Sequence, residues 1–132
     1  MKSAQATITV LMLLLTPSAA LPQGAGIEWD ILNQEVRSLY QNGQYDRAVV
    51  VAEKALTIQV KALGPDHPDV ATSLNNLAML YKNQGEYALA EPLYKRSLAI
   101  KEKVHGPEHP DVATTLKNLA RLYKTQGKYA EA

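Results

Sequence analysis

Apolar side chains recur every three or four positions through the middle of the chain, which is the spacing of one face of an α-helix. The first such stripe predicts a helix from about residue 68 to residue 84, and it consists of Leu74, Leu77, Ala78 and Tyr81. The second stripe predicts a helix from about residue 87 to residue 104, with Tyr87, Ala90, Tyr94, Ser97 and Leu98 facing inward. The pattern therefore predicts a pair of amphipathic helices.

Signals for starting and stopping a helix stand at the ends of these segments. Asp66 or His67 is placed to cap the first helix, and Pro68 follows in the first turn, where its missing N–H matters least. Gly85 ends the first helix, because a residue without a side chain adopts the left-handed conformation at little cost. We therefore expect a short turn between the two helices.

The helix pair repeats with a period of 42 residues. Residues 64–90 and 106–132 are identical at 20 of 27 positions, and Gly43, Gly85 and Gly127 follow the same step. This periodicity predicts copies at about 29–63, 64–105 and 106–132, of which the last is incomplete. The chain stops a few residues into the second helix of the third copy, so we expect the natural protein to be longer.

The first copy is the most divergent. The segment from Leu39 to Gly43 reads as one residue shorter than its counterpart before Gly85, and Ala52 stands where the second copy has Tyr94. Both differences fit an atypical terminal repeat.

The N-terminus has the layout of a secretory signal peptide. Lys2 is the only charged residue among the first 20, an apolar run of about eight residues follows, and Ser18-x-Ala20 resembles a cleavage site. A buried N-terminal helix is the alternative, but the apolar run shows no recurring polar face. We expect a signal peptide at 1–20, a flexible lead at 21–28, and export to the periplasm or the exterior without membrane insertion after cleavage.

Composition excludes several kinds of chemistry. Lys and Arg total 14 against 13 for Asp and Glu, so no overall positive charge attracts nucleic acid. The chain has no Cys, and neither a Ser, His and acid cluster nor a phosphate-binding glycine loop can be assembled. His67 and His109 lie in successive repeats, which favours helix starts over a shared metal site. We expect no enzyme activity, no cofactor and no metal.

The pattern of large and small residues resembles the tetratricopeptide repeat. The matching segment is Leu74-x-x-Leu77-Ala78-x-x-Tyr81-x-x-x-Gly85-x-Tyr87-x-x-Ala90-x-x-x-Tyr94-x-x-Ser97-Leu98. The 42-residue period, the Gly-Pro-x-His-Pro-Asp-Val-Ala linker and Leu-Asn-Asn-Leu-Ala resemble the kinesin light chain subclass, in an exported bacterial form. The resemblance implies an all-α, right-handed superhelical solenoid of antiparallel helix pairs.

The resemblance also implies a binding site. In tetratricopeptide proteins the first helices of successive repeats line a concave groove, and twelve positions of this chain match its lining. They are Thr72, Asn75, Asn76, Met79, Lys82 and Asn83 in the second copy, and Thr114, Lys117, Asn118, Arg121, Lys124 and Thr125 in the third. Asn76 and Asn118 match the asparagines of the family that bind a peptide backbone. The alternative is that these are ordinary solvated helix positions.

We therefore expect a scaffold that holds an extended, preferably acidic, protein or peptide segment in this groove. Two alternatives stay open. The chain could be the recognition region of a larger exported enzyme, for example one with a caspase-like peptidase domain, or it could be a structural scaffold that associates with itself.

Overall fold

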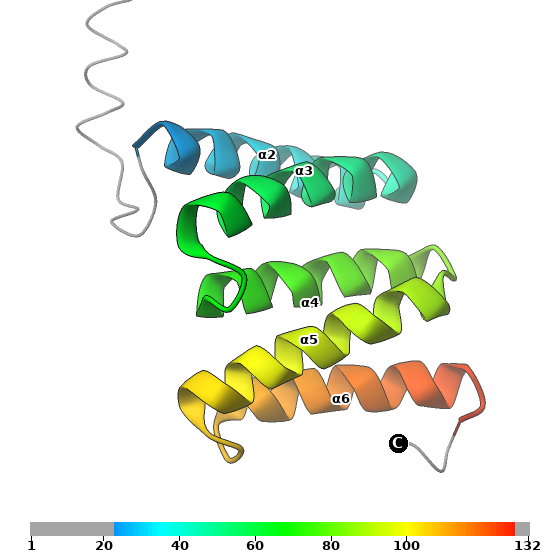
Figure 1. Ribbon diagram of the computed structural model, residues 1–132. Helices are drawn as coiled ribbons and strands as arrows, with labels where there is room; N and C mark the ends of the chain where they lie inside the picture. The colour runs from blue at the N-terminus through cyan, green and yellow to red at the C-terminus, as the bar shows by residue number, and fades with distance from the viewer. Residues whose placement is uncertain (1–22, 129–132) are drawn as a thin grey trace, which may run out of the picture.

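The computed structural model describes residues 23–128, which fold into α-helices without a strand. The helices are α2 (Gln23–Gln41), α3 (Tyr45–Leu63), α4 (Pro68–Asn83), α5 (Tyr87–His105) and α6 (Pro110–Thr125). They stack from α2 at one end to α6 at the other, each packed against the next in the chain (Figure 1). The all-α class agrees with the prediction. The predicted signal peptide and residues 129–132 lie outside the described residues.

Two histidines begin the first helices of the second and third copies. His67 caps α4 by accepting a hydrogen bond at Nδ1 from the backbone N–H of Asp69 (3.0 Å). His109 caps α6 in the same way through the N–H of Asp111 (3.1 Å). Each cap satisfies one of the backbone donors that the first turn of a helix leaves unpaired. The structure thus confirms a helix start at Pro68 and identifies His67, rather than Asp66, as the cap.

A glycine in the left-handed conformation ends each first helix. Gly85 has φ +81°, and the next residue donates its N–H to the carbonyl of Tyr81 (2.9 Å). Gly43 has φ +72°, and the next residue donates to the carbonyl of Leu39 (2.8 Å). Leu39 is therefore the counterpart of Tyr81, at the full 42-residue step.

The turn at Gly43 and the start of α2 each correct a prediction. The first copy is not one residue shorter, because pairing the tyrosines by identity misplaced Tyr40, which is the counterpart of Lys82. The flexible lead at 21–28 is also wrong from Gln23 onward, where α2 begins. Gly26 is buried and Ile27 half-buried within α2, and such packing offsets the helix penalty of a glycine, about 1 kcal/mol.

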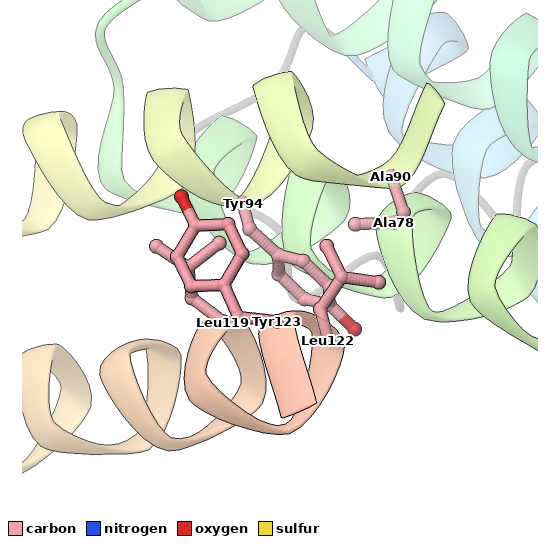
Figure 2. Packing of buried hydrophobic residues seen from close by; sticks show 6 residues of the cluster. All are labelled: Ala78, Ala90, Tyr94, Leu119, Leu122 and Tyr123. Carbon is pink, nitrogen blue, oxygen red and sulfur yellow. The ribbon is translucent and has the colours of Figure 1, made fainter. Parts of the chain in front are cut away.

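The helix pair α4/α5 packs through small and buried side chains. Ala78 on α4 and Ala90 on α5 have no exposed surface, and these small residues let the two helices approach closely. The hydroxyl of Ser97 donates to the carbonyl of Ala71 across the same interface (2.7 Å). From α5, the ring of Tyr94 reaches toward Leu122 and Tyr123 of α6 (Figure 2). Tyr94 thereby joins the second copy to the third.

Buried or partly buried polar pairs also connect successive copies. The Ser73 hydroxyl on α4 donates to Gln59 Oε1 on α3 (2.6 Å). One repeat further on, Lys101 Nζ on α5 donates to Thr115 Oγ1 on α6 (3.0 Å). Gln59 and Lys101 are equivalent, and so are the two hydroxyl residues. The same site between a second helix and the following first helix thus carries a polar bridge in both places.

Candidate functional site

The twelve predicted groove residues lie along α4 and α6, and none of them is fully buried. Exposed are Asn76, Met79, Asn83, Lys117, Arg121 and Lys124, and partly exposed are Asn75, Lys82 and Asn118. The packing residues of the same helices, such as Leu77 and Leu122, are buried. The predicted groove positions are therefore accessible on both helices.

The structure joins the groove faces of α4 and α6 through two asparagines. Asn118 Nδ2 donates to Asn75 Oδ1 across the two copies (3.2 Å). An amide offers two donors and a carbonyl with two lone pairs, so this single bond leaves each side chain further hydrogen-bonding capacity. Asn76, which is the second-copy counterpart of Asn118, is exposed on α4. The pair places amide groups at the boundary between the second and third copies.

A second contact joins α2 to the same face. Asn83 Nδ2 on α4 donates to Tyr40 Oη on α2 (3.2 Å). With the corrected register, the first-copy counterparts of the predicted positions are Asp30, Asn33, Gln34, Arg37, Tyr40 and Gln41. The sequence analysis predicted groove positions only in the second and third copies, so these residues were missed. The 42-residue step taken without a gap would have identified them.

Positive charge predominates along these equivalent positions of the three first helices. Arg37 on α2 adds to the four cations predicted on α4 and α6, which are Lys82, Lys117, Arg121 and Lys124. Asp30 is the only acidic residue among the same positions. Most of these charged side chains are exposed, so salt will screen their attraction for a ligand.

A hollow of about 490 Å³ lies between α2, α3 and α4. Its polar lining includes Asn33, Arg37 and Asn76 from the groove positions, and its apolar lining includes Leu56 and Leu77. Trp29 also lines the hollow, and its indole Nε1 is buried without a hydrogen-bond partner. The volume is within the range of pockets that take small ligands or side chains, about 300 to 1,000 Å³. No motif in the sequence indicated this hollow.

The histidine-rich linker before α6 has a different geometry from a metal site. The rings of His105 and His109 stack with centroids 4.3 Å apart, and His109 Nδ1 is occupied by its capping bond to Asp111. Within residues 23–128, no group of three His, Asp or Glu side chains is arranged to hold a metal ion. No helix in that range is long and apolar enough to span a membrane.

Shifted pKa values occur at contacts between helices. Burial lowers the pKa of Lys101, and the nearby charge of Asp111 opposes this effect in part. Burial also raises the pKa of Tyr81 to about 12, and its hydrogen bond to Glu53 acts in the same direction. Both groups join one copy to the next. Their shifts are explained by packing between helices rather than by a reactive centre.

Comparison with protein families agrees with this geometry. The family model for the tetratricopeptide repeat matches residues 30–103 and 69–132, which together make up more than half of the chain. The chain therefore belongs to the tetratricopeptide repeat family. A search of curated proteins finds no match.

Solved structures narrow the resemblance to kinesin light chain-like repeats. The chain is similar to a Podosopora anserina protein described as a putative kinesin light chain with nearly identical TPR-like repeats, with a TM-score of 0.70 and 29% identity over 92% of this chain and 56% of that one. A single-residue variant of the same protein gives a TM-score of 0.69 and 29% identity, over 92% and 56% of the two chains. BtubC (BKLC) from P. vanneervenii gives 0.68 and 28% identity, over 74% of this chain and 39% of that one. The chain thus spans less than two thirds of each neighbour's length.

Proposed function

We propose that this chain binds an extended segment of a partner protein along α2, α4 and α6. The observation that carries the proposal is the pair of cross-copy contacts, Asn75 with Asn118 and Tyr40 with Asn83, which link polar side chains of the three first helices. Binding a partner segment is the usual role of such helical repeats, and the amide side chains can pair with both the donors and the acceptors of a peptide backbone.

The preferred segment in this proposal is acidic. Five cations against one carboxylate at the equivalent groove positions favour carboxylate side chains. Each exposed cation should contribute only about 0.2 to 1 kcal/mol, whereas an asparagine that becomes buried under the ligand should matter by about 1 to 3 kcal/mol. Charge thus sets the preference for acidic ligands, while the amides supply more of the affinity per residue.

A peptide array followed by affinity measurements tests the proposal. Acidic peptides should bind best. A double Lys117→Glu, Arg121→Glu variant should bind them more weakly while keeping the helical content of the parent protein. Asn118→Ala should weaken acidic and neutral peptides alike, because it removes contacts to the backbone. The matched control is Lys103→Glu, which changes the same kind of charge on an exposed position of α5, away from the first helices.

Two results would contradict the proposal. One is a preference of the array for basic or purely apolar peptides. The other is unchanged peptide affinity in both groove variants. Raising the salt concentration should lower the affinity for acidic peptides more than the affinity for neutral ones. Equal salt dependence would argue against a role of the groove cations in binding.

Self-association of this chain is a second candidate, favoured by apolar side chains on α6 that no other helix within residues 23–128 covers. Leu116 is 45% exposed, although its counterpart Leu74 is 1% exposed under α5. Ala113 is likewise exposed where Ala71 is fully buried. An uncovered apolar stripe of this kind promotes contact between chains. A sizing experiment should then show concentration-dependent association that Leu116→Glu removes, while a monomer at all concentrations would exclude this candidate.

Export also stays a proposal, and it rests on residues 1–20. Intact-mass measurement of the protein recovered from an exported fraction should show loss of the segment through Ala20. A cytoplasmic product that retains Met1 would disprove export.

A further inference from the structure

The two junctions between copies differ at one position on the second helix. In the junction between the second and third copies, Tyr94 on α5 is 1% exposed and packs between α4 and α6 (Figure 2). In the junction between the first and second copies, the counterpart of Tyr94 is Ala52 on α3. Ala52 lines the hollow of about 490 Å³ described above. The smaller residue thus coincides with the hollow.

Three neighbours of Tyr94 have counterparts around the hollow. Tyr94 packs in one cluster with Ala78 of its own copy and with Leu119 and Leu122 of the following copy. The counterparts of these three residues at the 42-residue step are Val36, Leu77 and Leu80, and all three line the hollow. The hollow is therefore the site at which the other junction places an aromatic ring, with Val36 reducing its size slightly.

We propose that the hollow binds an aromatic side chain of the partner segment, which takes the place that Tyr94 fills in the next junction. The ring would lie against Leu77 and Leu80, while Asn33 and Asn76 from the same lining are placed to hold the peptide backbone on either side. A ring enclosed by apolar side chains gains most of its binding free energy from burial. This proposal rests on the proposed binding of a partner segment in the groove and adds one specific requirement to it.

The first experiment uses p-cresol, the analogue of a tyrosine side chain, so it does not depend on finding the partner. Trp29 is the only tryptophan of the chain and lines the hollow, so its fluorescence and its indole N–H resonance report occupancy. We expect p-cresol to shift both signals saturably and to show nuclear Overhauser contacts to the methyl groups of Val36, Leu77 and Leu80. Absence of these contacts overturns the proposal, whether or not peptides bind the groove.

The second experiment fills the hollow with a side chain of the protein itself. Ala52→Tyr supplies the ring that the other junction has, so p-cresol affinity should fall by about tenfold or more. Val36→Ala combined with Ala52→Tyr reproduces the surroundings of Tyr94 more closely and serves if the single variant folds poorly. Ala88→Tyr adds the same ring at an exposed position of α5 and should bind p-cresol as the parent does. Equal p-cresol affinity in the parent and a folded Ala52→Tyr variant overturns the proposal.

A third measurement separates this proposal from the proposed function. Peptides selected on the array should lose affinity when their aromatic residue is changed to alanine, and Ala52→Tyr should remove that difference. If peptides bind but neither substitution alters their affinity, the hollow does not bind the aromatic side chain, and the proposed binding of a segment in the groove still holds. If p-cresol occupies the hollow but no peptide binds, the hollow is a ring site and the proposed function is wrong.

Discussion

Lys101 on α5 donates a hydrogen bond of 3.0 Å to Thr115 on α6, and both side chains are buried, at 8% and 0% exposure. One repeat earlier the same two positions hold Gln59 and Ser73, joined at 2.6 Å. The chain thus builds an equivalent bridge from a lysine and a neutral hydroxyl in one junction and from two neutral side chains in the other. A buried charge needs its hydrogen-bond partner more than a neutral amide does.

Exchanging these bridges should be tolerated, whereas breaking one should not. The double change Lys101→Gln, Thr115→Ser installs the pair of the other junction, so the free energy of unfolding should change by less than about 1 kcal/mol. Thr115→Val leaves the ammonium group without its partner and should cost about 1 to 3 kcal/mol. Denaturant unfolding measures both. The exposed Lys103→Gln is the control, and a larger loss from the exchange than from Thr115→Val would contradict the prediction.

Truncating equivalent leucines should have unequal effects. Leu74 is 1% exposed between α4 and α5, so Leu74→Ala should destabilise the chain by about 2 to 5 kcal/mol. Leu116 holds the same repeat position on α6 but is 45% exposed, so Leu116→Ala should lower the free energy of unfolding much less than Leu74→Ala does. Thermal and denaturant unfolding of the two variants provide the comparison. Similar losses would show that the face of α6 is covered in solution.

The left-handed turn after α4 should depend on glycine through its backbone alone. At Gly85 a Cβ atom would meet no atom within 4 Å, yet φ is +81°. Gly85→Ala should therefore cost about 1 to 2 kcal/mol from backbone strain. Gly24 also has open space but lies in the first turn of α2, so Gly24→Ala should stabilise by about 0.4 to 1 kcal/mol. Unfolding curves that rank the two variants the other way would disprove this account.

Stability should fall in strongly alkaline solution. The pKa of Tyr81 is raised from 10.0 to about 12, first by burial and then by its hydrogen bond to Glu53. In the unfolded chain this phenol loses its proton near pH 10 while the folded chain still holds it, so its stabilising effect is complete below pH 10 and is lost as the pH rises through about 12. Burial raises the pKa of Tyr94 as well and adds to the same trend.

Tyr81→Phe isolates this effect. The variant cannot ionise at this position, so its free energy of unfolding should fall less steeply between pH 10 and pH 12 than that of the parent. Denaturant unfolding at several pH values measures the two slopes. Parallel curves for parent and variant would mean that other groups cause the alkaline loss.

The sequence alone determined the helices and their repetition. Helix starts at His67 and stops at Gly85 depend on local chemistry, because a cap or a left-handed turn involves residues only a few positions apart. The 3.6-residue periodicity likewise separated the core position Leu77 from the accessible position Asn76 on the same helix. The 42-residue step then assigned these local features to successive copies.

Only the tertiary structure decided how the copies meet. The buried bridge from Lys101 to Thr115 and the packing of Tyr94 against Leu122 each depend on how α5 and α6 lie against one another. The pairing of Asn75 with Asn118 and the hollow beside Ala52 join side chains that lie far apart along the chain. Local patterns carry no information about such contacts, because these contacts arise from the distances between packed helices and from the volume that each side chain fills.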